Sequence, residues 1–431
     1  MSVGHSRIQR YRVYCVDESV YKSVWGGKAP TVCPDDCMHA IDATKTVVID
    51  DIPITKNPLT SFDELRVSER TGIIELKSIY GKSELRDRYI GSVTNNLGDS
   101  EYNLRVTSSN DVSAVISAQR GRYVAGTQGE VGIAVRVPEG MSNDQQLRIG
   151  LFDESNGFFF MYNSNGINTV IRRDGVDAVT ERGDFNWDAM DGTGPSKYCL
   201  DSKDGIVYTI RFSWYGYGNI EFRMNTTNSL LEQSTWLANV YSPYAETSVK
   251  TPNLPISVEL RNNGTVATTD AFVAGRQYAI LGRYHPISRM NSLYVSSVSI
   301  NSSSSWIPMF SIRRKTGYLG NSIKGFGMDS TTTQDLYIQV RTSGTPNSPV
   351  WSTPPDMDAA DTAVEVDTNS TSLSGGKPIW TGMVAGDKNA YVGDLNIMYD
   401  MSEYDAITVL AKGITSTNGT ISAVFRWKEE W

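Results

Sequence analysis

The fold of this chain is decided by a stretch that reads Ile210-Arg211-Phe212-Ser213-Trp214-Tyr215-Gly216-Tyr217-Gly218-Asn219-Ile220-Glu221-Phe222. Apolar and polar side chains alternate on both sides of a two-glycine hinge. Aromatic and β-branched side chains pack well on a pleated sheet, and glycine permits the tight reversal that joins two strands. The stretch holds no set of catalytic side chains. It therefore predicts a β scaffold that presents surfaces.

The same pattern recurs through the middle of the chain. Short apolar segments separated by turn residues lie at 72–76, 131–137, 147–152, 158–162, 168–172, 207–212 and 256–260. Asn163–Gly166 and Arg173–Gly175 indicate hairpin turns, because Asn-Gly and Asp-Gly tolerate positive φ. Many short strands with frequent turn signals are typical of a two-sheet sandwich. We predict an all-β, multi-domain protein with a central jelly-roll or lectin-like β-sandwich over residues 61–305.

Smaller β domains are predicted at both ends of the chain. Residues 1–60 form a cysteine-containing attachment module, with strands at 10–16, 21–25 and 46–50. Residues 306–431 form a C-terminal β domain, with strands at 308–313, 335–340 and 421–427. Residues 343–376, rich in Pro, Ser, Thr, Asp and Gly, are expected to be a long surface loop with one strand at 363–366. One helical turn is expected at 64–70.

Charge and hydropathy exclude several classes of function. The 431 residues carry 40 Lys plus Arg against 48 Asp plus Glu, a net charge of −8. Direct binding to nucleic acid is not expected, because such binding needs clustered positive charge that releases counterions. The sequence has no apolar run near the ~18 residues of a membrane span. Met1–Arg12 lacks the apolar core of a signal peptide, so we expect synthesis in a host cytoplasm.

Cys15, Cys33, Cys37 and His39 could form a four-ligand zinc site, which would hold together a module with little core of its own. Their spacing is irregular, without the usual paired Cys-x2-Cys knuckles. Two other interpretations stay open. Cys15 and Cys33 could be small buried apolar residues, with His39 in an ordinary hydrogen bond. A disulfide could also form after host lysis.

The aromatic residues of the central hinge have two interpretations. Trp214, Tyr215 and Tyr217 could form a platform on which the apolar face of a sugar stacks. The competing interpretation, which the alternation favours, is that alternate members fill the sandwich core. Asp184, Asp188 and Asp191 could likewise bind Ca²⁺, although acidic residues beside a glycine-rich turn are usually turn formers.

The sequence does not predict an enzyme. The carboxylates of Asp174 and Glu181, or of Asp153 and Glu154, could be paired as in glycosidases, but nothing in the sequence places them at the ~5–9.5 Å that such a pair requires. The chain has three histidines, His5, His39 and His285, and no serine lies in a Gly-x-Ser-x-Gly elbow.

Several landmarks in consistent order carry a resemblance to a known family. They are Tyr11–Cys15 with Trp25, Ala29–Thr31, Cys33-Pro34 and His39; Leu59–Glu69; Asp191–Ser196 with Leu200-Asp201 and Lys203; Trp214–Gly218; Asn253–Ile256; and Pro308–Arg313 with Phe425–Glu429. Together they resemble virion structural proteins of large double-stranded DNA phages and large algal DNA viruses. The sequence departs from that pattern at Lys197, where a glycine is usual, and at Cys37, which is additional.

The resemblance implies a component of a virus particle: a minor, capsid-associated protein, a fiber or spike, or a tail protein. Its partners would be other virion proteins and further copies of this chain in a homo-oligomer, for which we expect a trimer on general grounds. An alternative is a receptor-binding module whose central sandwich recognises a host surface glycan. A polysaccharide-degrading spike is a third interpretation. The resemblance transfers no catalytic motif.

Overall fold

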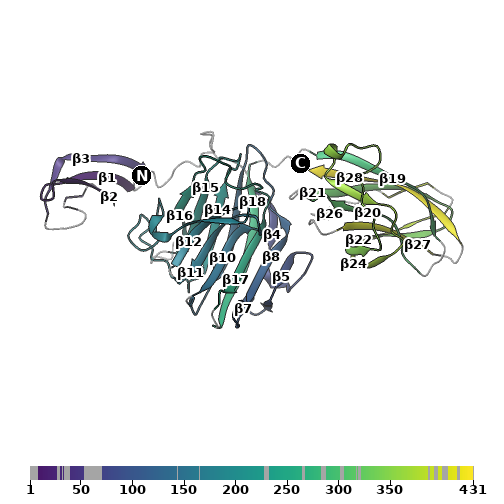
Figure 1. Cartoon of the computed structure of the whole chain (residues 1–431), viewed down its shortest axis with the longest axis horizontal. Helices are drawn as coiled ribbons and strands as arrows, with labels where there is room; N and C mark the ends of the chain where they lie inside the picture. Colours follow the sequence, from purple (N-terminus) through teal and green to yellow (C-terminus); the bar gives the residue numbers. More distant parts are fainter. Residues whose placement is uncertain are drawn as a thin grey trace, which may run out of the picture. The chain divides into compact units, whose positions relative to one another are not determined.

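The described residues of the computed structural model form five β-sheets: one small sheet near the N-terminus, two in the middle of the chain and two in its C-terminal part (Figure 1). The structure describes residues 8–26, 30–31, 33, 39–52, 70–142, 144–164, 166–227, 233–264, 267–282, 288–300, 305–316, 318, 322–386, 389–392, 397–399, 406–414 and 418–430. Across these ranges the regular elements are strands, apart from three single 3-10 turns. The all-β prediction is confirmed. Within the same ranges there is no helix with the length and apolarity that a membrane crossing needs.

The N-terminal strands form a small antiparallel sheet. Its order is β2-β1-β3, with β1 at Ile8–Cys15, β2 at Val20–Gly26 and β3 at Ile41–Ile52. The three strands predicted for this region are confirmed. The described residues give the sheet few buried side chains, namely Tyr11, Val13, Cys15 and Cys33. The predicted helical turn falls mainly on residues 64–69, which lie outside the described residues, and Arg70 begins strand β4.

The central part of the chain is a two-sheet sandwich. One sheet has seven strands in the order β13 (Val176–Thr180), β12 (Gly166–Arg173), β11 (Asn156–Asn163), β10 (Gln145–Phe152), β17 (Pro255–Asn262), β8 (Val112–Arg120) and β5 (Asp87–Ile90). The other has eight, in the order β16 (Gln233–Tyr241), β15 (Ile220–Thr227), β14 (Ile206–Phe212), β9 (Gln128–Arg136), β18 (Thr269–Leu281), β7 (Glu101–Val106) and β6 (Ser92–Asn96), with β4 (Arg70–Leu76) paired to β18.

Alternation along the strands builds the core of the sandwich. Phe158 and Phe160 of β11 point inward, where Phe158 meets Phe212 of β14 at 4.6 Å between ring centroids and Phe160 meets Tyr208 at 5.2 Å. The two predicted hairpin turns are confirmed by the pairings Asn163 with Gly166 and Arg173 with Val176. In the second turn Asp174 and Gly175 have φ of 54° and 78°, the left-handed values that favour Asp-Gly.

A buried ion pair joins the two sheets. Asp87 of β5 accepts two hydrogen bonds from Arg276 of β18, at 2.7 and 3.0 Å, and the side chains are 2% and 0% exposed. A register shift in β18 between Val273 and Arg276 precedes this arginine. The Ser78 hydroxyl donates to the carbonyls of Val273 and Ala274, at 3.0 and 2.9 Å, which satisfies the irregular backbone.

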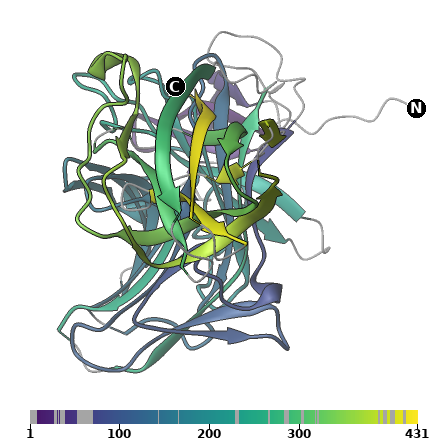
Figure 2. The same ribbon diagram turned by 90° about the vertical axis from the view of Figure 1, so that its right-hand side faces the viewer.

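The C-terminal part of the chain contains two five-stranded sheets. One has the order β19 (Ser288–Ile300), β28 (Gly419–Glu430), β21 (Ser322–Thr332) and β25 (Asn389–Val392), with β26 (Ile397–Tyr399) paired to β21. The other has the order β23 (Val364–Asp367), β20 (Ile307–Arg314), β27 (Ala406–Gly413), β22 (Leu336–Pro346) and β24 (Leu373–Val384). Strands β19 and β28 run side by side (Figure 2). Their pairing places residues 288–300 with the C-terminal sheets, whereas the sequence pattern predicted them within the central sandwich.

The segment 343–376, predicted to be a long loop, belongs to strands at both of its ends. Strand β22 continues to Pro346 and β24 begins at Leu373, and the two pair through Gly344 and Gly375. The strand predicted at 363–366 is present as β23. Ser, Thr and Gly at the end of β22 and the start of β24 are typical of loops. They are extended here because the two strands pair with each other, which overrides the weak local preference of these residues.

Candidate functional site

The turn between β14 and β15 lies at an end of the central sandwich where several loops meet. We define this loop end as residues 123–127, 153–156, 174–175, 213–219 and 242–254. Hydrogen bonds connect its segments: Ser248 N donates to Gly216 O at 3.0 Å, Tyr123 N to Asn253 Oδ1 at 2.8 Å, and Lys250 N to Asn156 Oδ1 at 2.8 Å. The loop end is therefore a connected surface rather than a set of independent turns.

Three aromatic residues of the hinge take different positions in this loop end. Trp214 is half-buried and packs against the sandwich core, whereas Tyr215 and Tyr217 are 46% and 59% exposed. The ring of Tyr123 contacts Trp214 and Tyr215 edge-on, at 5.6 and 6.1 Å between centroids. The core interpretation thus describes Trp214, and the two tyrosines lie at the surface.

The backbone of the turn fixes both tyrosines. Tyr215 and Gly216 have φ of 42° and 80°, and the Tyr215 N–H donates to the Tyr123 hydroxyl at 3.1 Å. Burial raises the pKa of Tyr123, so that oxygen stays a neutral phenol. At Gly218 a Cβ would lie 1.3 Å from the Ser213 carbonyl oxygen, so only glycine fits. A strained turn held by hydrogen bonds presents its side chains with little freedom to lose on binding.

The polar groups around the tyrosines are amides and paired charges. Asn219 Oδ1 accepts from the Ser242 hydroxyl at 2.8 Å, and Lys250 Nζ lies 2.8 Å from Asp174 Oδ2. The Lys250 ammonium lowers the pKa of Asp174 by hydrogen bonding and by charge. Tyr244, in the segment after β16, is 98% exposed. Exposed aromatic faces beside amide and carboxylate groups suit a neutral polyhydroxylated ligand.

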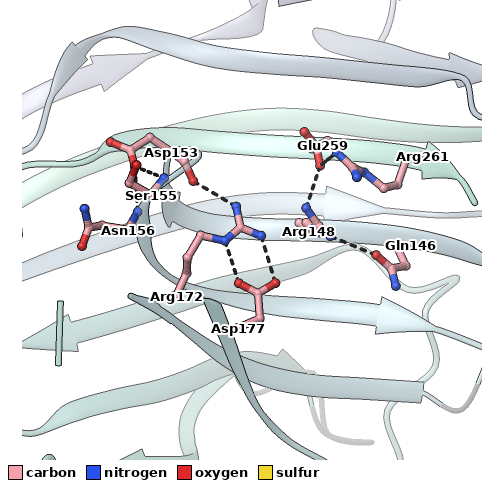
Figure 3. Close-up of polar contacts among 9 residues, drawn as sticks. All are labelled: Gln146, Arg148, Asp153, Ser155, Asn156, Arg172, Asp177, Glu259 and Arg261. Atoms are coloured by element: carbon pink, nitrogen blue, oxygen red, sulfur yellow. Dashed lines mark hydrogen bonds and ion pairs between the residues drawn. The ribbon is translucent and has the colours of Figure 1, made fainter. Parts of the chain in front are cut away.

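The outward face of the seven-stranded sheet carries a second polar arrangement (Figure 3). Arg172 of β12 forms a two-point ion pair with Asp177 of β13, at 2.6 and 2.9 Å, and also donates to the Asp153 carbonyl. Hydrogen bonding to Asp177 raises the pKa of Arg172. On neighbouring strands Arg148 and Arg261 both contact Glu259, at 3.2 and 2.8 Å. Burial lowers the pKa of Arg148, with Arg261 adding to the effect.

These arginines cover a small apolar cluster made of Phe152, Phe159, Met161 and Val170. The guanidinium carbons of Arg172 and Arg148 lie 5.1 and 6.0 Å from the centre of the Phe159 ring. Phe159 leans over Gly150, where a Cβ would lie 2.6 Å from the Phe159 Cα. Each arginine therefore stacks on an aromatic ring while its acidic partner neutralises it, an arrangement that accounts for the charges without a ligand.

Four of the acidic residues considered for calcium binding or acid–base catalysis make structural hydrogen bonds or ion pairs. Asp188 is buried and accepts from Met190 N at 2.8 Å and Ser196 N at 2.7 Å, while Asp191 accepts from Thr193. These are the bonds of turn formers, the role that their sequence context favours. Asp153 closes its turn by accepting from the N–H groups of Ser155 and Asn156, at 2.9 and 2.8 Å. Asp174 pairs with Lys250.

The N-terminal sheet brings together most of the predicted zinc ligands. Ligand atoms of Cys15, Cys33, His39 and Glu18 all lie within 4.8 Å of one another. Cys37 and His285 lie outside the described residues. Glu18 was not among the predicted ligands. It stands in the β1–β2 turn, three residues after Cys15, and only the fold brings Cys33 and His39 close to it.

No family model and no curated protein sequence matches this chain. Solved structures with a similar arrangement include the metal-free carbohydrate recognition domain of Emp46p, at 9% identity and a TM-score of 0.32, covering 49% of this chain and 97% of that one. The lumenal domain of VIP36, bound to Ca²⁺ and Man3GlcNAc, has 12% identity and a TM-score of 0.30, covering 50% and 92%. A putative β-glucanase from Mycobacterium abscessus has 9% identity and a TM-score of 0.30, covering 49% and 98%. Likeness of this degree says nothing about ligands.

Proposed function

We propose that the central sandwich is a carbohydrate-binding module and that its loop end is the binding surface. The observation that carries the proposal is the pair Tyr215 and Tyr217, exposed on a turn whose position 218 accepts only glycine. Aromatic rings bind the apolar faces of sugars, and a ring already fixed in place loses little entropy on binding. Tyr123 supports the turn through its ring contacts with Trp214 and Tyr215.

The resemblance to virion proteins implies a component of a virus particle, and the ligand that we propose is a glycan on the surface of its host. In that setting the chain would be a receptor-binding component of the particle. The loop end carries Asp153, Glu154, Asp174 and Glu246 against Lys250, a net charge of −3, and Arg173 beside it pairs with Glu246. A neutral glycan therefore fits better than a sulfated or sialylated one.

The test is binding of the full chain to a broad array of immobilised glycans. We expect the wild-type chain to bind a subset, and the Tyr217→Ala variant to bind the same subset about tenfold more weakly, which corresponds to one lost stacking contact. Tyr80→Ala is the matched control. Tyr80 is 70% exposed in the 3-10 turn Ser78–Tyr80, which contacts β18 at Val273 and Ala274 rather than at the loop end. Equal weakening by both variants, or no binding to any glycan, would refute the proposal.

An assembly role in the particle is a second candidate, favoured by strand β13. It is one of the two edge strands of the seven-stranded sheet in the part of the chain that the structure describes, and Val176 and Val179 on it are 72% and 47% exposed. An open edge with apolar side chains is a ready surface for pairing with another chain. If β13 mediates assembly, the wild-type chain should sediment as an oligomer and the Val179→Lys variant as a monomer in sedimentation velocity. A monomeric wild-type chain absent from purified particles would exclude this role.

We propose a binding role rather than catalysis. Asp177 and Glu259, the carboxylates on the outward sheet face, are paired with arginines. A glycosidase needs two carboxyl groups that flank the scissile bond, and both of these carboxylates are engaged by guanidinium groups instead. Release of reducing ends from host surface polysaccharide by the purified chain would contradict this assignment.

A further inference from the structure

The N-terminal module has a cluster of soft and borderline metal ligands around the end of β1. Cys15, the last residue of that strand, is fully buried, and Cys33 is 2% exposed. His39 Nδ1 lies 3.8 Å from Cys15 Sγ and 3.0 Å from Glu18 Oε1. Two thiols, an imidazole nitrogen and a carboxylate oxygen thus converge on one point, within 4.8 Å of one another.

Backbone hydrogen bonds hold this convergence in place. Cys33 N donates to His39 O at 3.2 Å, which links these two residues directly. Val16 N donates to Ala40 O at 2.9 Å, and Ala40 N donates to Asp17 Oδ2 at 2.7 Å. The chain around residue 40 is therefore tied to the turn that carries Glu18. The cluster is built into the fold of the module rather than assembled by chance from mobile side chains.

The spacing suits a tetrahedral zinc ion. Zinc lies about 2.3 Å from a cysteine sulfur and about 2.0 Å from a histidine nitrogen, so neighbouring ligand atoms in a tetrahedron stand roughly 3.3–3.8 Å apart. Two of the observed separations, 3.8 Å and 3.0 Å, lie close to that range, and side-chain rotations would bring in the others, which are within 4.8 Å. Glu18 Oε2 meanwhile pairs with Lys22 Nζ at 2.5 Å. Such an outer contact orients a carboxylate whose other oxygen binds a metal.

The module also needs the energy that a metal would supply. Its described residues bury little more than Tyr11, Val13 and the two cysteines, and chains below about 40–70 residues rarely fold on so small a core without a metal or disulfides. A structural zinc ion contributes its binding free energy directly to folding.

We propose that Cys15, Glu18, Cys33 and His39 bind one structural zinc ion, with both cysteines as thiolates and His39 coordinating through Nδ1. This set replaces Cys37 of the sequence-based prediction with Glu18. The site is independent of glycan binding at the loop end, and it anchors the β1–β2 turn to Cys33 and His39.

The full chain, purified without chelator, should contain one zinc ion per chain by elemental analysis. Cys33→Ser should lose it, whereas Cys199→Ser, which changes an exposed cysteine of the central sandwich, should keep it. In the wild-type chain, replacing zinc by Co²⁺ should give sulfur-to-cobalt charge-transfer absorption with the intensity of two thiolates. Removing zinc with a chelator should make residues 1–60 sensitive to protease while the sandwich stays resistant.

Several outcomes would overturn the proposal. Wild-type protein that neither contains zinc nor binds Co²⁺ would do so, as would a Cys15–Cys33 disulfide found by mass spectrometry in protein prepared under reducing conditions. A cobalt spectrum of three thiolates, lost in Cys37→Ser but kept in Glu18→Gln, would reject Glu18 as a ligand in favour of Cys37. The cobalt spectrum uses the wild-type chain, so it decides the matter even if the cysteine variants fail to fold.

Discussion

The buried ion pair between Asp87 and Arg276 provides the sharpest test of how the central sandwich is held together. Asp87→Ala would leave the Arg276 guanidinium buried between the sheets without its carboxylate. The side chains are 2% and 0% exposed, so water cannot replace the lost partner. Removing one member of such a pair costs about 3–5 kcal/mol.

The size of the sandwich converts that cost into a shift in melting temperature. For a unit of this size each kcal/mol lowers Tm by about 2–4 °C, so Asp87→Ala should lower the Tm of the central transition by roughly 6–20 °C. The double variant Asp87→Ala/Arg276→Met removes both charges. It should recover most of the loss, because the desolvation cost of the arginine disappears with it.

Differential scanning calorimetry of the two single variants and the double variant measures this coupling directly. A double-mutant cycle with a coupling free energy of about 2 kcal/mol or more is expected for residues in direct contact. Arg105→Ala is a suitable control, since the Arg105 side chain is exposed and 3.9 Å from Asp270, and exposed pairs contribute about 0–1 kcal/mol. Strictly additive single and double variants would refute the claim that this pair links the sheets.

Three further predictions concern other parts of the chain. Gly218→Ala should abolish glycan binding and lower the stability of the sandwich by about 3 kcal/mol, because its Cβ would overlap the Ser213 carbonyl; unchanged binding by this variant would contradict the fixed-turn argument. Glu429 is fully buried and accepts hydrogen bonds from Asn291, Thr362, Ala363 and Trp427 at 2.6–2.8 Å. Glu429→Gln should therefore lower the free energy of unfolding of the C-terminal sheets by roughly 3–5 kcal/mol. Calorimetry should show the central transition unchanged. Hydrogen bonds from Thr107 N and Ser108 N hold the pKa of Asp111 below its ordinary 3.8, so its contribution to stability is present above that pH and is lost as pH falls through the lower folded-state pKa. The Tm of Asp111→Ala should therefore be lower than that of the wild type at pH 7, and the two Tm values should converge in acid. A difference in Tm that persists at low pH would show that the ionised Asp111 side chain is not its cause.

About half of the strands could be predicted from the sequence, and two of the missed ones illustrate one cause. Phe158–Tyr162 and Val207–Phe212 are strongly apolar, and their hairpin partners follow turns with clear signals. Strand β8, Val112–Arg120, and strand β18, Thr269–Leu281, contain Ser, Ala, Gln and Gly, which favour no single local structure. They become strands because central positions in their sheets supply partners on both sides.

The candidate sites were predictable only in part. Cys15, Cys33 and His39 could be singled out by residue type, but Glu18 looks like any exposed acid of a turn until the fold brings Cys33 and His39 beside it. Trp214, Tyr215 and Tyr217 could be singled out as aromatic. Which of them faces the core could not be predicted, because the left-handed φ of Tyr215 breaks the simple alternation on which the core interpretation depended.

By itself the sequence determined the β class, the positions of the two predicted hairpin turns and the net charge of −8. These follow from alternation, turn residues and composition, which can be read along short stretches. Tertiary structure alone decided that Asp87 meets Arg276, that β19 pairs with β28, and that Tyr215 and Tyr217 stand exposed at the loop end. Such contacts join residues far apart in the chain. Their stability depends on packing and desolvation at the point of contact, which no local pattern records.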